Sequence, residues 1–544
     1  MPAKPSLWSR LSAGVSRFAQ AFARKPAASG VRMYASARQS RLTGGWLAPN
    51  SSADAELYTS LRTLRGRSRQ LVRDAGFAGR AKMLVINNII GHGIGIQAQV
   101  ATTRDSLNER VNSAIEREFE HWMRAENCHL AGALHFHDIE RLAMGEVFEA
   151  GDHFIRLHPV AVGESRVPLA LELIEAERLA DDYVLPGPTV NGNEIRMGVE
   201  VDATGRAVAY WIRPRHAGDI RTAPGSAERL ERVPAEFIVP LFPIHRWPQT
   251  RGVPWLHAAA KKLHDLDEYT DAELTAARMS AYYFASVETA EENPMGAVTQ
   301  PGADNQGRQQ INIEPGMIEQ LLPGEKLNFH APNRPNSAAD AFTRFMLREV
   351  ASALNVSYAS LSADYSQSNY SSSRLALLDD RDLWRVLQRW YVRQFRERLH
   401  RVWLQRAVYA RAIPEIPVEQ YAVDPQKFEA VRFKLRGWSW VDPTKEVAAY
   451  KEAVLAGFMT VADVIELTGN GADIEDTLNR RRQELDMMAK LGLKFDTEAA
   501  AATELQPVRP QPAADQSDED AQDEAAEDDE QDAAPAARRV IPLR

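Results

Sequence analysis

The chain has 544 residues, 44% of them hydrophobic and 26% charged, which indicates an ordinary soluble protein of several domains. Its single cysteine, Cys128, excludes a disulfide within the chain and fits a reducing compartment. No apolar run approaches the roughly 20 residues that a membrane-spanning helix needs. We therefore expect no membrane among its partners.

Charge is segregated along the chain. Residues 1–41 contain eight Lys or Arg and no acid, whereas residues 515–532 contain eleven Asp or Glu and no base. Without that acidic run the net charge changes from −9 to +2. The run contains no aromatic residue, so we expect a disordered tail that acts either as an electrostatic lure or as a solubiliser.

The basic N-terminal arm contains an amphipathic pattern over residues 7–24. Arg10, Arg17 and Arg24 accompany apolar side chains at helical spacing, which are Leu7, Leu11, Val15, Phe18 and Phe22. Three interpretations compete, namely a membrane-surface helix, an organelle transit peptide and an arm that docks on a partner. The docking arm or a plain terminal helix is the more conservative choice. The hydrophobic region of a secretory signal is missing, so we do not expect export.

The first half of the chain is expected to form a mixed α/β unit. Helices are predicted over 54–85 and 106–126, and strands over 145–242. The clearest signal is a hairpin, in which IRMGVEV and RAVAYWI alternate on both sides of DATG. The glycines of NNIIGHGIG (87–95) lack the GxGxxG spacing and follow a helix, so they predict a helix-to-strand turn rather than a phosphate-binding loop.

The second half alternates long helices with small modules. The stretch SADYSQSNYSSSR (362–374) has almost no charge and is predicted to be a loop, because its hydroxyl and amide side chains compete for backbone hydrogen bonds. The other predicted elements, in chain order, are a helix over 253–285, a Gly/Pro-rich insertion over 286–330 with short strands QINI and IEQLL, a helix over 337–354, the longest helix over 373–412, and three helices over 443–492.

No catalytic constellation is present. The sequence lacks GxxxxGK[ST], GxSxG and HExxH, so we expect no catalytic residue and no cofactor. Cys128, His129, His135 and His137 lie close together, but their spacing is poor for one zinc ion, and ordinary packing is the favoured interpretation. We therefore expect no metal.

Three acids, Asp379, Asp380 and Asp382, lie close together in the longest predicted helix. They are expected in its first turns, where acids stabilise the helix dipole, and a cation-binding role is the alternative.

The longest predicted helix carries a basic stripe of Arg381, Arg385, Arg389 and Arg393, which recur every fourth residue and so lie near one face. Residues 374–406 contain nine Arg against four acids. Such a stripe can pair with phosphate or with carboxylates of a neighbouring subunit, and a solvated helix face is the alternative. No motif that reads bases is present, so any contact with DNA is expected to be independent of sequence.

From about residue 34 to 495 the chain resembles the lambda-type portal proteins of tailed bacteriophages. The segments that carry the resemblance, in order, are LRTLRGRSRQLVRDAGFA with NNIIGHGIGIQ, EIRMGVEVDATGRAVAY, QTRGVPWL with LDEYTDAEL, IEPGMIEQLLPGE, LSADYSQSNYSSSR, and WSWVDPTKE with GFMTVADVI.

The resemblance implies a helix-rich α+β portal-type fold with an α/β wing, a helical stem, a small α/β clip and a helical crown. The implied domains are a basic arm (1–33), the wing (34–252), a first stem helix (253–285), the clip (286–336), a second stem helix (337–361), a channel loop (362–373), a long helix returning to the wing (374–440), the crown (441–495) and the acidic tail (496–544).

The implied function is a non-enzymatic ring, usually of twelve copies, at one capsid vertex in the virion, assembled in the host cytoplasm. Double-stranded DNA passes through it during packaging and ejection. Implied partners are the terminase large subunit, the major capsid and scaffold proteins, and a head-completion or connector protein. Two alternatives are another head-tail adaptor component and a non-specific DNA-binding enzyme with an unrecognised active site.

The uncharged stretch falls where portal proteins place a loop that points into the channel. Contacts between cations and phosphate would retard moving DNA, whereas neutral hydroxyls and amides make weak, exchangeable contacts. Packing between subunits is the alternative. The expected channel-loop residues are Asp364, Tyr365, Ser366, Gln367, Ser368, Asn369, Tyr370 and Ser371.

Overall fold

The structure is a computed structural model, and it describes residues 49–103, 106–188, 192–219, 229–282, 285–289, 325–329, 338–366, 369–438, 443–468 and 474–492. The predictions for the N-terminal arm, the acidic tail and the strands QINI and IEQLL lie outside these residues. The chain divides into two compact units, 1–472 and 473–544. The described element of the second unit is α16 (Ile474–Leu491), and all that follows concerns the first unit unless α16 is named.

The helix predicted over 54–85 is two helices, α2 (Ala53–Asp74) and α3 (Gly76–Ile89). The prediction of one helix was wrong because Ala75 is extended, with ψ 118°. α2 begins at Ser52, whose side chain accepts a hydrogen bond from the Ala55 N–H at 3.2 Å. The predicted turn at 87–95 is confirmed, since α3 ends at Ile89 and strand β1 (Gly95–Ala98) follows.

Glycine is required within that turn. Gly93 has φ +119°, and a Cβ atom there would lie 2.2 Å from the imidazole ring of His137. The turn therefore brings the backbone against α6 more closely than another residue would allow.

Two antiparallel sheets form the strand-rich part of the unit. One has the order β10-β4-β5 and the other β6-β7-β8-β9, and a two-stranded pair joins β1 to β13. The predicted hairpin is confirmed as β7 and β8, with Val199 opposite Tyr210. The strands are β4 (His153–His158), β5 (Ala170–Ile174), β6 (Glu194–Arg196), β7 (Val199–Val201), β8 (Ala207–Ile212), β9 (Glu231–Pro234), β10 (Ile238–Leu241) and β13 (Val431–Lys434).

The main core lies between helices and the first of these sheets. Phe119, Trp122, Phe136 and Trp403 meet there, and the rings of Phe119 and Trp403 are 4.9 Å apart in an edge-to-face arrangement. The helices around this core include α4 (Glu109–Trp122), α5 (Ala125–Cys128), α6 (Phe136–Ala150), α12 (Val418–Val423) and α13 (Pro425–Phe428).

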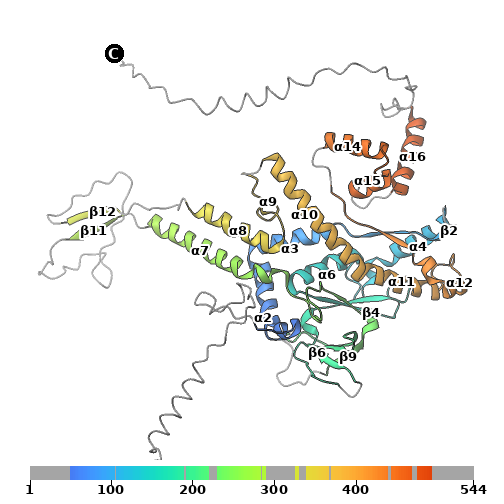
Figure 1. Ribbon diagram of the computed structural model, residues 1–544, viewed down its shortest axis with the longest axis horizontal. Helices are drawn as coiled ribbons and strands as arrows, with labels where there is room; N and C mark the ends of the chain where they lie inside the picture. Colours follow the sequence, from blue (N-terminus) through green and yellow to red (C-terminus); the bar gives the residue numbers. More distant parts are fainter. Residues whose placement is uncertain are drawn as a thin grey trace, which may run out of the picture. The chain divides into compact units, whose positions relative to one another are not determined.

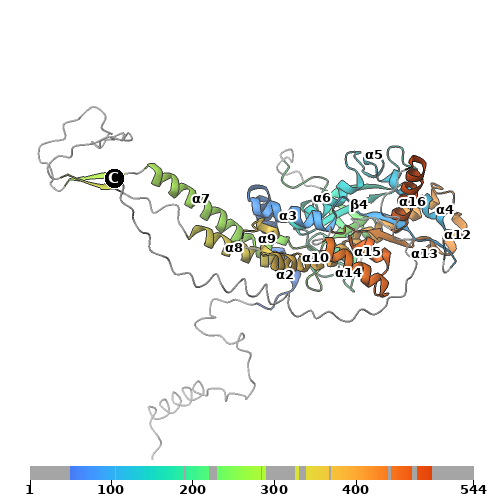
Figure 2. The same cartoon turned by 90° about the horizontal axis from the view of Figure 1, so that it is seen from above.

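Two helices lie side by side beyond this core, α7 (Ala260–Tyr282) and α8 (Ala339–Leu354) (Figures 1 and 2). The rings of Tyr269 and Phe342 join them at 4.8 Å, and Lys262 pairs with Glu349. The predicted start at residue 253 was too early, because a 3₁₀ turn, Trp255–Ala258, precedes α7. Strands β11 (Ala285–Thr289) and β12 (Glu325–Phe329) pair antiparallel within the predicted insertion.

The longest predicted helix is confirmed, with an earlier start. It consists of α10 (Tyr370–Tyr391), a π-helical segment (Val392–Arg396) and α11 (Glu397–Tyr409) (Figure 1). A short helix, α9 (Tyr358–Ser362), precedes it. The three helices predicted over 443–492 are also confirmed, as α14 (Pro443–Leu455), α15 (Val461–Thr468) and α16. Of the helices in the described residues, none is long and apolar enough to cross a membrane.

The core contains an unpaired histidine that is expected to set acid sensitivity. Both ring nitrogens of His400 lack a hydrogen-bond partner among the described residues, and its ring stacks on Trp403. Burial, together with Arg396 and Arg401, lowers the pKa of His400 to about 3. Below pH 6.5 the unfolded chain therefore binds a proton at this histidine that the folded chain does not bind. The free energy of unfolding then decreases by about 1.4 kcal/mol for each unit by which the pH is lowered.

We expect His400→Phe to remove this contribution, because phenylalanine keeps the aromatic contacts and does not titrate. The thermal midpoint should fall less between pH 7 and pH 5 in the variant than in the parent chain. Scanning calorimetry at both pH values measures the difference, and His264→Gln on the exposed surface of α7 is the control. An unchanged pH dependence in His400→Phe would show that the histidine is not buried as described.

Candidate functional site: the channel segment, the arginine stripe and the buried ion network

The predicted channel loop is shorter than expected. α9 ends at Ser362, and α10 begins at Tyr370. The assignment of Tyr370 and Ser371 to the loop was therefore wrong, and both lie in the first turn of α10. The cause is Asn369, whose side chain accepts a hydrogen bond from the Ser372 N–H at 2.8 Å and so caps the helix. We call residues 363–369 the channel segment. Gln367 and Ser368 lie outside the described residues.

Asp364 holds the start of the channel segment in place. Its carboxylate accepts hydrogen bonds from the Tyr358 hydroxyl at 2.8 Å, the Ser366 N–H at 3.0 Å and the Ser366 hydroxyl at 2.6 Å. Arg344 of α8 lies 3.6 Å away. The hydrogen bonds from Ser366, then that from Tyr358, lower the pKa of Asp364 to about 2. The acid therefore has an anchoring role, while Tyr365 next to it is 62% exposed.

A second carboxylate fixes α9 to α10. Asp380 is buried and accepts hydrogen bonds from the Ser357 N–H at 2.8 Å and from the hydroxyls of Ser357 and Ser360, both at 2.7 Å. The prediction that Asp379, Asp380 and Asp382 lie in the first turns of the long helix was wrong, because α10 begins at Tyr370. Asp380 thus fixes the helix before the channel segment to the helix after it.

The arginine stripe is divided between two environments. Arg381 and Arg385 lie over the indole of Trp438, with 6.0 and 5.7 Å between guanidinium carbon and ring centre. Arg385 also pairs with Asp382 at 2.8 Å. Arg389 and Arg393 are exposed. The expectation of one uniform basic face is corrected, because Trp438, which lies about 50 residues further along the chain, covers the first two members.

A cavity of about 240 Å³ lies beside this stripe, between α10, the segment after β13, and α15. Three guanidinium groups line it, those of Arg385, Arg389 and Arg436. Its two carboxylates have partners already, since Asp463 accepts a hydrogen bond from the Thr460 N–H at 2.9 Å and Glu466 pairs with Arg432. The lining thus carries three guanidinium groups and two carboxylates, of which Arg385 and Glu466 are already in ion pairs.

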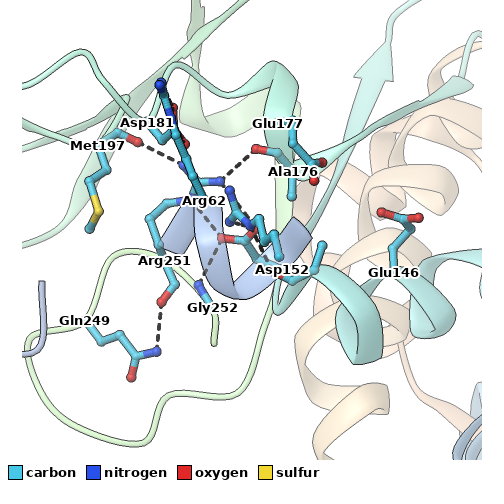
Figure 3. A network of polar contacts seen from close by, with 12 residues as sticks. Arg62, Glu146, Asp152, Ala176, Glu177, Asp181, Met197, Gln249, Arg251 and Gly252 are labelled. Carbon is cyan, nitrogen blue, oxygen red and sulfur yellow. Dashed lines mark hydrogen bonds and ion pairs between the residues drawn. The ribbon is translucent and has the colours of Figure 1, made fainter. Parts of the chain in front are cut away.

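A buried ion network lies where α2, β4 and the segment leading to α7 meet (Figure 3). Asp152 is 0% exposed, and its carboxylate accepts hydrogen bonds from Arg65 at 2.6 Å and from Arg251 at 2.7 Å. The Gly252 N–H adds a third at 2.9 Å. Burial opposes ionisation, but the two guanidinium groups hold the pKa of Asp152 below its ordinary value.

The same two arginines also bind backbone carbonyls. Arg251 donates to Met197 at 3.1 Å and to Ala176 at 2.8 Å, and Arg65 donates to Ala150 at 2.9 Å. The network therefore connects both sheets, α2, α6 and the chain that leads into α7 (Figure 3). It fixes the point from which α7 leaves the rest of the unit.

Other arginines of α2 surround this network nearer the surface. Arg69 pairs with Glu146 at 2.8 Å and Glu177 at 2.9 Å, and Arg62 pairs with Asp181 at 2.5 Å. These two arginines fix α2 to the rest of the unit through ion pairs.

The cysteine and histidine group does not form a metal site. Cys128 is buried, and its thiol lies 3.4 Å from the Met123 carbonyl oxygen. His135 accepts a hydrogen bond from the His137 N–H, and His137 contacts Glu140 at 2.9 Å. Within the described ranges, no group of three or more His, Cys, Asp or Glu side chains is placed to hold a metal ion.

Comparison with known proteins gives a consistent result. A family model described as phage portal protein, lambda family, matches residues 39–388. The chain is 29% identical to a protein named probable portal protein from Halomonas phage phiHAP-1, over 85% of this chain and 88% of that one. It is 22% identical to portal protein B of Escherichia phage lambda, over 84% of this chain and 90% of that one.

Among solved structures, the chain is similar to one from the neck of a native gene transfer agent particle computed with C12 symmetry. The TM-score is 0.38 and the identity 13%, over 74% of this chain and 92% of that one. A portal protein of the HK97 family from Corynebacterium diphtheriae gives a TM-score of 0.26 at 12% identity, over 71% of this chain and 98% of that one.

Proposed function

The chain belongs to the lambda family of phage portal proteins, structural proteins of the capsid vertex rather than enzymes, and we propose that about twelve copies form a closed ring through which double-stranded DNA is packaged and ejected. The observation that carries the proposal for this chain is the channel segment, whose only charged residue, Asp364, anchors its start, and whose preceding helix α9 is fixed to α10 by Asp380. Assembly takes place in the host cytoplasm.

We assign the domains as follows. α7 and α8 form the stem, and the segment 286–336 between them forms the clip. The sheets with α2 to α6, together with the chain over 374–440, form the wing. The crown is 441–495. The buried network around Asp152 then lies at the junction of wing and stem, where it holds the stem at a fixed angle to the wing.

The channel segment is proposed to face the DNA. Its attachment to α8 through Arg344, and to α10 through Asp380 and α9, prevents it from folding away under the force of translocation. Its exposed tip carries Tyr365 and neutral side chains, which give DNA phosphates no fixed cation to bind. The DNA contact is therefore weak and independent of sequence.

The exposed face of α10 is proposed to contact the neighbouring subunit. Leu375, Leu378 and Val386 are 70%, 42% and 62% exposed, and they share a face with Arg389 and Arg393 at spacings of three, four and eight residues. Apolar side chains in such a row are typical of helix contacts that are buried on assembly. We therefore favour the inter-subunit role for the exposed half of the arginine stripe.

Several further partners follow from this proposal. The clip would receive the terminase large subunit during packaging and a head-completion or connector protein afterwards. The wing would meet the major capsid and scaffold proteins during assembly.

The test is native mass spectrometry of the purified full chain, combined with negative-stain imaging. We expect a hollow ring of about twelve copies, which fits a closed heterologous assembly. Val386→Asp should prevent ring formation while the chain stays folded, whereas Val423→Asp, at an 86% exposed position on α12, should not. A chain that stays monomeric with scaffold and capsid protein present would overturn the proposal.

A further inference from the structure

A hollow of about 460 Å³ lies between α2 and the first turns of α7. Leu64 and Leu71 of α2 and Leu256 of the 3₁₀ turn supply an apolar floor. Ser68 also lines it, and the Ser68 hydroxyl is buried without a hydrogen-bond partner among the described residues. An apolar floor with one unsatisfied hydroxyl is the surface that an amphipathic segment would complete.

The rim of the hollow towards α7 is acidic. Asp265 and Asp267 are exposed, and neither carboxylate has an ion-pair partner in the part of the chain that the structure describes. Residues 265–273 contain five acids and no base. Two cations also line the hollow, Arg67 of α2 and Lys261 of α7, so the acidic character rests on Asp265, Asp267 and the acids that follow them along α7.

The N-terminal arm has the complementary properties. It carries eight cations and no acid over residues 1–41, and residues 7–24 place five apolar side chains at helical spacing with three arginines. Such a helix could lay its apolar side chains on the floor and its arginines against the α7 acids. Complementary charge fixes which side chains meet as well as adding affinity.

The arm is long enough to reach the hollow. The described chain starts at Pro49, next to the beginning of α2 at Ala53. Leu71 lies about 27 Å along α2 from Ala53, at 1.5 Å per residue. Residues 25–48 span at most about 80 Å when extended. The segment 7–24 can therefore turn back along α2, and its attachment keeps its effective concentration there high.

We propose that residues 7–24 dock as an amphipathic helix in this hollow, between α2 and α7 of the same chain. The sequence of the arm left three interpretations open. The structure supplies a surface for one of them, the docking arm. The proposal does not depend on the portal ring, because every residue involved belongs to one chain.

Cross-linking in the full chain tests this proposal. The one native cysteine, Cys128, is buried, so only the two introduced cysteines are expected to react with the cross-linker. We combine Arg17→Cys with Lys261→Cys at the hollow, and as a control with Arg110→Cys, an exposed position on α4. With a short bismaleimide, docking is expected to make the first pair react at least about fivefold faster, because the arm is concentrated at one site.

Charge reversal gives the matched comparison. Asp267→Lys should abolish the faster cross-linking in the cysteine pair and, in the chain that keeps Arg17, should speed tryptic cleavage at Arg17. Asp379→Lys, at an exposed acid on α10, should change neither. Mixing isotope-labelled and unlabelled chains before cross-linking tells products within a chain from products between chains. Equal rates for the two cysteine pairs, or products that join two chains, would overturn the proposal. Ring formation, measured separately by native mass spectrometry, decides the portal assignment independently.

Discussion

Asp152→Ala is expected to lower the thermal midpoint of the full chain by about 10 °C. The change would leave the guanidinium groups of Arg65 and Arg251 buried without a counter-charge, and removing one partner of a buried ion pair costs about 3–5 kcal/mol. For a cooperative unit of about 150–250 residues, the size of the sheets with α2 to α6 that surround this network, each kcal/mol corresponds to about 2–4 °C. Scanning calorimetry measures the shift, and the region where α2, β4 and the segment leading to α7 meet is expected to open first.

Asp181→Asn is the matched control, because it breaks an ion pair to Arg62, whose side chain is 65% exposed. A pair of this kind contributes at most about 1 kcal/mol. Replacing Arg65, Asp152 and Arg251 together by apolar residues should not restore stability, because the carbonyls of Met197 and Ala176 would lose their donors. A midpoint for Asp152→Ala within about 2 °C of the parent would contradict a stabilising network.

Ser368→Arg is expected to reduce DNA packaging by about tenfold while rings still form, because each added cation binds phosphate and the ring repeats it in every subunit. Ser368 lies between the described residues Ser366 and Asn369 of the channel segment. The measurement is the length of DNA protected from nuclease in a reaction with purified proheads and terminase. Electron microscopy of the same portal preparation counts the rings.

Two control variants distinguish the effect of the added charge on packaging from the effects of side-chain size and of position in the chain. Ser368→Asn keeps the site neutral and should package normally. Ala203→Arg adds the same charge at an exposed residue of the β7–β8 turn and should also package normally. Normal packaging by Ser368→Arg would place the segment away from the DNA and favour packing between subunits.

Periodic patterns in the sequence predicted the helices well but not all of their ends. The three helices over 443–492 were predicted correctly because glycines separate the three segments in which apolar residues recur at helical spacing. The break at Ala75 was missed, although Gly76 follows it. The start of α10 was placed late because several neighbouring residues can cap a helix, and the choice of Asn369 depends on its hydrogen bond to Ser372.

The candidate site was only partly accessible from the sequence. The uncharged composition of the channel segment is a local property and was recognised. The covering of Arg381 and Arg385 by Trp438 depends on how the chain returns after β13, which no local pattern specifies. Asp152 was missed for the same reason, since nothing in the sequence distinguishes it from the other 73 acids.

The pairing of β1 with β13 has a consequence for biosynthesis. Gly95 lies opposite Lys434, so the main core cannot close until more than 430 residues have left the ribosome. The chain from α7 to α11 is synthesised between these two strands, so β1 and β13 can pair only after all of it has been made. Because the chain returns to pair with β1, the segment between the two strands can gain or lose length during evolution while the pairing stays intact. A phage lineage could thus change the segment between α7 and α8 without redesigning the sheets and helices around the main core.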